Sequence, residues 1–208
     1  MESPQLVSVI KDCIIAAASC IGAGVAILGL DAWKKQLKGT TSYQVAQKLL
    51  RTALYLRDAI SDARQRIIWG GEMVGRDVAK DETIAETQVK GEAYAYTKRL
   101  SAVRTAHSDF YSAGVEARTV WGEDTVSDAL QSLTKLTNEL VMAASDYFDM
   151  RLEEAKKQAN DRVEIRRLRG IIFSIYPSRN EQGKTDDYSG RLVTVLQAIE
   201  TLCRKHLK

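Results

Sequence analysis

The sequence predicts an all-α protein, with an N-terminal transmembrane helix followed by an elongated antiparallel helical bundle or coiled-coil hairpin. The first observation is the scarcity of proline: Pro4 and Pro177 are the only two in 208 residues, so nothing between them forbids long helices. Aromatic residues make up 7% of the chain and charged residues 27%, which is typical of helical bundles. Apolar residues also recur at alternating spacings of three and four, which indicates helical seams.

The first element is the apolar run Cys13–Leu30, which holds eighteen residues without a charge. As a helix it would be about 27 Å long, close to the hydrocarbon thickness of a bilayer. Positive charge follows the run, which predicts that the N-terminus lies outside and the rest in the cytoplasm. We therefore expect a single-pass protein of the bacterial inner (plasma) membrane: a short extracytoplasmic segment (1–12), a transmembrane helix (13–33) and a cytoplasmic bundle (34–208). Its predicted membrane-interface anchor consists of Trp33, Lys34, Lys35 and Lys38.

Small residues repeat at a spacing of four within this run, at Ala18, Gly22 and Ala26. Small side chains allow two helices to approach closely in lipid, so these are candidate positions for transmembrane packing. Most residues of the run are small, however, and other faces fit the same test. A buried helix of a soluble domain is the alternative interpretation of the whole segment.

Further helices are expected over about 42–68, from residue 77 or 80 to 118, from 124 or 125 through 150, and over 188–205. Gly39 should end the first helix, and Thr41 with Gln44 forms a capping box for the second. The "WGED" turn at 121–124 is short, which predicts antiparallel neighbours. The charged stretch 151–169 should continue the fourth helix in solvent. The seam of the second helix extends to Ile67, and the predicted bundle seam comprises Leu49, Leu56, Ile60, Leu100, Leu133, Leu136 and Leu140.

The stretch "GIIFSIYPSRNEQGKTDD" contains Gly-Lys-Thr but has Ser178 where a phosphate loop needs its first glycine, so we expect a surface loop. His107 lies on an apolar seam without a second histidine nearby, and the three cysteines lack zinc-site spacing. The formal charge of +3 is too small to indicate nucleic acid. We therefore expect no enzymatic activity, no cofactor or metal, no nucleic-acid partner and no small-molecule substrate.

Four stretches carry a resemblance: "DAWKKQLKG" after the apolar run, "YQVAQKLLRTALYLRDAI", "WGED" and "LVTVLQAIETLCRKHLK". Together they resemble an uncharacterised family of bacterial single-pass membrane-anchored helical proteins. That family has no assigned activity, so the resemblance implies architecture and location and transfers no site. The Asn-Pro break that the family has after its second helix is missing here, and Arg64-Gln65-Arg66 is expected to continue the helix instead.

The predicted function is that of a membrane-anchored helical scaffold or partner-recruiting protein. Its expected partners are the lipid bilayer and either an unidentified protein or a second copy of the chain. A protein partner is expected because the apolar seams of the helices must be buried against each other or against another chain. The main alternative is a membrane-active effector that oligomerises through its transmembrane helix. An envelope spacer outside the cytoplasm and a hydrolase that depends on His107 are two further alternatives.

Overall fold

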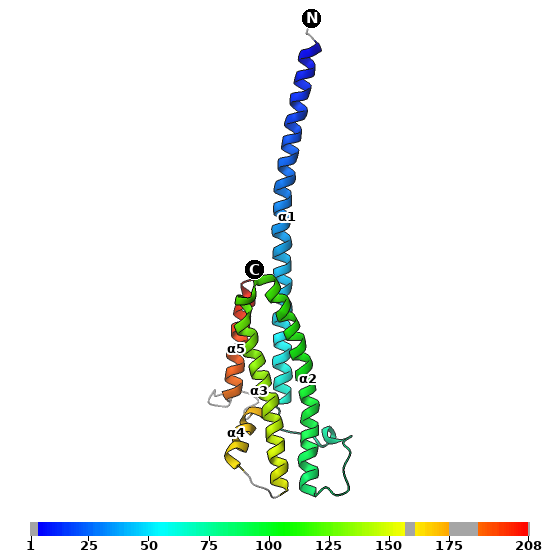
Figure 1. Ribbon diagram of the computed structural model, residues 1–208, viewed down its shortest axis with the longest axis vertical. Coiled ribbons are helices and arrows are strands. Elements are labelled where there is room, and N and C mark those ends of the chain that lie inside the picture. The colour runs from blue at the N-terminus through cyan, green and yellow to red at the C-terminus, as the bar shows by residue number, and fades with distance from the viewer. Residues whose placement is uncertain (1–3, 157–160, 175–186, 208) are drawn as a thin grey trace. The chain divides into compact units, whose positions relative to one another are not determined.

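The computed structural model describes residues 4–156, 161–174 and 187–207 (Figure 1). In the N-terminal part, side chains are described at Ser19, Gly22 and Gly24–Leu30 and from Ala32 onward. Every element in these ranges is a helix, which confirms the all-α class. The chain divides into two compact units, Met1–Gln44 and Val45–Lys208.

Helix α1 runs from Pro4 to Ala63, so the predicted helix end at Gly39 is wrong. The hydroxyl of Thr41 donates to the carbonyl of Leu37 at 2.9 Å, one turn earlier in the same helix. The hydroxyl of Thr40 bonds to the carbonyl of Gln36 in the same way. A threonine hydroxyl that is satisfied inside the helix does not cap a new one, and this explains why the capping-box pattern misled the prediction.

No helix among the described residues is long and apolar enough to cross a membrane. This finding contradicts the predicted transmembrane helix 13–33 and, with it, the single-pass localisation in an inner membrane. In the sequence the apolar run is followed by Asp31 and, three residues later, by Lys34, so charged residues begin where the run ends.

The second unit contains a bundle in which residues 45–63 of α1, α2 (Ile84–Trp121), α3 (Glu123–Ala155) and α5 (Asp187–Arg204) alternate in direction (Figure 1). Only Gly122 separates α2 from α3; its φ of +92° favours glycine, and the predicted turn is confirmed. Leu130 of α3 packs so closely on Gly114 of α2 that a Cβ there would lie 2.6 Å from it. The residues predicted as the bundle seam all lie buried in this core: Leu49, Leu56, Ile60, Leu100, Leu133, Leu136 and Leu140.

Helix α4 (Arg162–Ile172) is separate from α3, which ends at Ala155, so the charged stretch does not continue the fourth helix as predicted. The carboxylate of Asp161 accepts bonds from the backbone N–H groups of Val163 and Glu164 and caps the new helix. Leu168 and the apolar end of α4 are buried in the core, while its arginines are exposed. The predicted surface loop around Gly183-Lys184-Thr185 lies outside the described residues.

Helix α1 ends at Ala63, so the expected continuation of the helix through Arg64-Gln65-Arg66 is wrong. Arg64, the next residue, connects the end of α1 to two other helices. The residue is 2% exposed. Its guanidinium donates to the carbonyls of Ile171 (2.7 Å) and Gly170 (3.1 Å) in α4 and to the hydroxyl of Ser189 (2.7 Å) in α5. It also lies 4.4 Å over the ring of Tyr188. The end of α1 is therefore tied to α4 and α5 by one buried side chain.

Candidate functional site

The segment between α1 and α2, residues 64–83, is called the connection here. It contains the short 3₁₀ helix η1 (Gly70–Met73) and is otherwise non-helical. The guanidinium of Arg99 in α2 donates to the carbonyls of Gln65 and Ile67, both at 2.7 Å. It also binds the carboxylate of Glu72 at 2.6 and 2.7 Å, and these bonds lower the pKa of Glu72. One α2 side chain thus holds the first half of the connection.

Two further α2 side chains hold the middle of the connection. The hydroxyl of Tyr94 donates to the carbonyl of Gly75, and the ammonium of Lys98 donates to the carbonyl of Val74, both at 3.2 Å. Gly75 has a φ of +93°, which a residue with a Cβ rarely adopts. The backbone at 74 and 75 is therefore held by hydrogen bonds from Tyr94 and Lys98, in a conformation that favours glycine at position 75.

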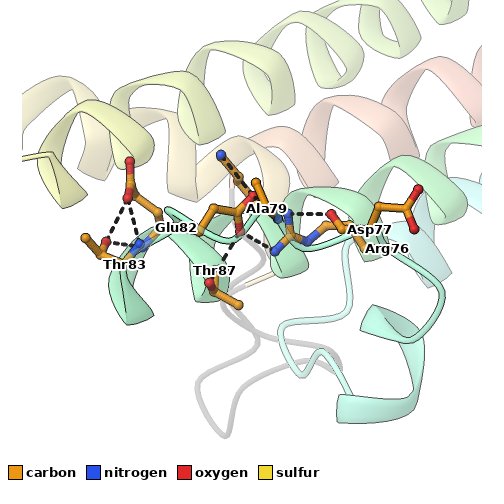
Figure 2. A network of polar contacts seen from close by, with 8 residues as sticks. Arg76, Asp77, Ala79, Glu82, Thr83 and Thr87 are labelled. Carbon is orange, nitrogen blue, oxygen red and sulfur yellow. Dashed lines mark hydrogen bonds and ion pairs between the residues drawn. The ribbon is translucent and has the colours of Figure 1, made fainter.

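Figure 2 shows a third group of contacts that holds the connection, after those of Arg99 and those of Tyr94 and Lys98. It is centred on Glu82. The side chain of Glu82 is 6% exposed; it accepts two bonds from Arg76, at 2.9 and 2.6 Å, and one from Lys90 at 3.1 Å. The bonds from Arg76 lower the pKa of Glu82 to about 2. The ion pairs are therefore complete above the ordinary pKa of 4.5 and are lost only as the pH falls from there towards 2. Directly after this group of contacts, Thr83 and Glu86 form the capping box that starts α2.

A cleft of about 320 Å³ lies between the end of the connection and the first turns of α2. Met73, Val78 and Ile84 supply its apolar wall, and the Glu82 network supplies its polar wall. A Cβ at Gly91 would lie 3.0 Å from the sulfur of Met73, so glycine gives the methionine room in this cleft. The cleft therefore combines an apolar wall with charges that are already paired.

Large apolar side chains are exposed along the connection and at the first residue of α2, although the backbone of the connection is held in place. They are called the apolar set here: Ile67 (62% exposed), Trp69 (68%), Val74 (70%), Val78 (58%) and Ile84 (92%). Single exposed apolar residues are common, but here five large ones lie within eighteen positions. Because the neighbouring carbonyls are bonded to α2, these side chains are presented on a fixed backbone.

The residues that the sequence singled out lie elsewhere. Trp33, Lys34, Lys35 and Lys38 are exposed on α1 in the first unit, as are Gly22 and Ala26, while the side chain of Ala18 lies outside the described residues. His107 is half-buried, its Nε2 lies 3.2 Å from the hydroxyl of Thr134, and burial lowers its pKa. In the described part of the chain, no three His, Cys, Asp or Glu side chains are placed to hold a metal ion.

The apolar set could not be recognised from the sequence pattern, which placed Ile67 on the seam of a helix. The structure ends that helix at Ala63 and exposes Ile67, so this assignment is wrong. The signal that could have found the site is the interruption "WGGEM", where a tryptophan stands beside two glycines. The partners that fix this stretch, such as Arg99, lie about thirty residues away and leave no local pattern.

We expect Glu82→Gln to loosen the connection, because glutamine cannot form the ion pairs with Arg76 and Lys90. The expected result is several-fold faster tryptic cleavage after Arg76 and Lys80, measured by limited proteolysis of the folded protein with mass spectrometry. Asp81→Asn is the matched control, since it removes the same charge from an exposed neighbour. Equal cleavage rates in the two variants would show that the Glu82 network does not hold the connection.

Comparisons of the chain with protein-family models, with curated proteins and with solved structures find no match. The resemblance noted in the sequence therefore stays a prediction, and the site is interpreted from its own geometry.

Proposed function

We propose that this chain is a helical scaffold that recruits a protein partner through the apolar set of the connection. The observation that carries the proposal is the combination of a firmly anchored backbone with exposed Trp69, Val74, Val78 and Ile84. Burial of a large apolar side chain contributes about 1.5–3 kcal/mol, so covering several of these residues together would favour a complex. A backbone that is already ordered loses little entropy on binding, which favours affinity further.

The cleft beside Ile84 indicates what the partner presents. Its charged groups, Arg76 and Glu82, bind each other, and Lys90 binds the same carboxylate, so an incoming charge would have to compete with existing ion pairs. An apolar side chain instead gains contacts with Met73 and Val78 and leaves the network intact. The partner therefore supplies an apolar anchor residue that enters this cleft, and its surroundings cover Trp69.

The test is site-specific photo-crosslinking in cells, with a photoreactive phenylalanine analogue in place of Trp69. We expect one discrete cross-linked species, and we expect Val78→Asp to abolish it. Val115→Asp is the matched control, because Val115 is similarly exposed but belongs to α2 away from the connection. A second analogue at Thr105, exposed on α2, should give no such species.

Two results would contradict the proposal. The first is a cross-linked species that persists in Val78→Asp, and the second is the same species formed from position 105. Either would show that the apolar set does not select the partner.

A further inference from the structure

Helix α4 carries three arginines whose side chains have no partner in the described part of the chain. Arg162, Arg166 and Arg169 are exposed, and no hydrogen bond or ion pair joins their guanidiniums to a described residue. The remaining arginine of the helix, Arg167, differs because it binds Glu164 at 2.6 Å. The three unpaired guanidiniums, called the basic row here, are therefore available to an anionic partner.

The basic row occupies one face of a helix that is fixed to the core. Its spacings of four and three keep the three side chains within about 60° around the helix axis and spread them over about 10 Å along it. Leu168 and Ile171 are buried, about 130° and 170° from the middle of this face. The carbonyls of Gly170 and Ile171 accept bonds from buried Arg64. The row is thus presented on an ordered backbone.

Helix α3 carries the opposite charge on its own outer face. Asp146, Asp149 and Glu153, called the acidic row here, are exposed, and no ion pair joins their carboxylates to a described cation. Their spacings of three and four place them within about 60° around the axis. Buried Tyr147 and Phe148 lie about 130° away on either side. The acidic row is therefore a solvent-facing surface, like the basic row.

The two rows match in number and in spacing. Each has three charges within eight residues of one helix. When the helices run antiparallel, the spacings coincide and every member faces one of opposite charge: Arg162 with Glu153, Arg166 with Asp149 and Arg169 with Asp146. The planar guanidinium of arginine binds a carboxylate through two parallel hydrogen bonds. Each row is thus a complementary partner for the other.

Within one chain the rows form no ion pair with each other, although α3 and α4 pack together (Figure 1). The side of α4 that lies near the carboxylates of α3 is that of Arg167. The pKa of Arg167 is raised mainly by its bond to Glu164 and, at longer range, by the charges of Glu139 and Asp146. Arg167 lies about 130° around the helix from the middle of the basic row. A second copy is therefore needed to bring the two rows together.

We propose that the basic row of one copy binds the acidic row of a second copy of this chain. The complementary charge that the chain itself carries selects this occupant. Helix α4 has no aromatic residue on which nucleic-acid bases could stack, and its three unpaired arginines are fewer than the roughly four to eight basic residues of a typical lipid-binding cluster. The proposal goes beyond the recruitment of a partner by the connection, because neither row shares a residue with the apolar set.

The first test is sedimentation equilibrium of the full chain at two salt concentrations. At about 10 mM salt the Debye length is about 30 Å, whereas at about 1 M it is about 3 Å. We expect an average mass above that of one chain at low salt, and a fall of about tenfold or more in the association constant at high salt, because exposed ion pairs are screened. An average mass that is the same at both salt concentrations would overturn the proposal.

A matched pair of single substitutions locates the surface. Arg166→Glu should weaken the association at low salt several-fold, because it places a carboxylate opposite the acidic row. Arg104→Glu is the control: Arg104 is also exposed on a helix, α2, and its side chain has no partner among the described residues. Equal effects of the two substitutions would show that net charge, and not the basic row, controls the association, and would contradict the proposal.

Exchange of the charges identifies the occupant. One variant makes the basic row acidic, with Arg162→Glu, Arg166→Glu and Arg169→Glu. The other makes the acidic row basic, with Asp146→Arg, Asp149→Arg and Glu153→Arg. We expect each variant alone to have the mass of a single chain at low salt, because rows of like charge then repel. An equimolar mixture should recover the association of the wild type, since every row again meets the opposite charge.

The remaining outcomes of the exchange also decide the question. Circular dichroism first shows that both variants keep the helical content of the wild type. A mixture that stays monomeric would overturn the proposal, because the acidic row would then not be the partner of the basic row. A wild type that is monomeric at low salt would overturn it as well. Binding of that wild type, but not of the variant with an acidic row on α4, to anionic vesicles or to an oligonucleotide would then assign the basic row to lipid or to nucleic acid.

Discussion

Arg64→Ala is expected to lower the free energy of unfolding by about 3–5 kcal/mol, the loss typical of breaking a buried charged network. The substitution removes the donor to the carbonyls of Gly170 and Ile171 and the bond to Ser189. It also removes the guanidinium that stacks on Tyr188. Buried carbonyls that lose their donor retain the full cost of desolvation, so the effect exceeds the net value of the bonds. Urea unfolding monitored by circular dichroism gives the value directly.

Arg57→Ala is the control for this experiment. Arg57 is exposed, and its guanidinium bonds to the neighbouring carboxylate of Asp58 at 2.8 Å. Exposed pairs of this kind contribute about 0–1 kcal/mol, so the midpoint of unfolding should barely move. A loss below about 1 kcal/mol in Arg64→Ala would mean that the contacts between α1, α4 and α5 do not depend on this side chain.

Tyr96→Ala should destabilise the protein by about 3–5 kcal/mol, as expected for removing a buried aromatic ring. Tyr96 is 1% exposed, and its ring centroid lies 5.5 Å from that of Phe148 and 5.9 Å from that of Phe173. Its hydroxyl donates to the carbonyl of Ile172 at 2.8 Å, and burial raises its pKa. The ring therefore joins α2 and α3 to the end of α4.

Tyr96→Phe separates the two contributions, because it keeps the ring and removes only the hydroxyl. We expect a loss of about 1–2 kcal/mol, since the carbonyl of Ile172 is then buried without that donor. Tyr55→Ala serves as the surface comparison, because Tyr55 is exposed on α1. If Tyr96→Phe destabilised the protein as much as Tyr96→Ala, the hydrogen bond of the hydroxyl would contribute more to stability than the packing of the ring. Both variants are compared in the same urea titrations.

The helices of the bundle could be predicted because their signal is local. A side chain at one position and its neighbours three and four residues away share a helix face, so Leu49, Leu56 and Ile60 indicate a buried seam before any partner is known. The same reasoning places Leu133, Leu136 and Leu140 in the core. The turn at Gly122 could be predicted for a similar reason, because it requires a residue that adopts positive φ.

The helix boundaries were predicted less well, because they depend on competition between local alternatives. Thr41 could cap a helix or bond back to Leu37, and the second alternative prevails in the structure. Asp161 caps a new helix where the charge pattern suggested that the old one continues. In both cases the residue types allow two arrangements, and spacing alone does not choose between them.

The apolar run at the N-terminus shows a further limit of prediction from the sequence alone. Its length and flanking charges predicted a membrane span, whereas no helix in the described residues is long and apolar enough for one. Composition indicates that the apolar groups of a segment need to be buried. It does not indicate whether lipid, the rest of the chain or another protein buries them.

The sequence by itself determined that this protein is helical, where most of the buried seam positions of the bundle lie and where α2 turns into α3. Those properties follow from interactions between residues that are close along the chain. Only the tertiary structure decided that Arg99 holds Gln65 and Ile67, that Arg64 binds α4 and α5, and that Trp69 and Ile84 remain exposed. Such contacts join residues up to 125 positions apart, and a hydrogen bond over that separation leaves no periodic trace in the sequence.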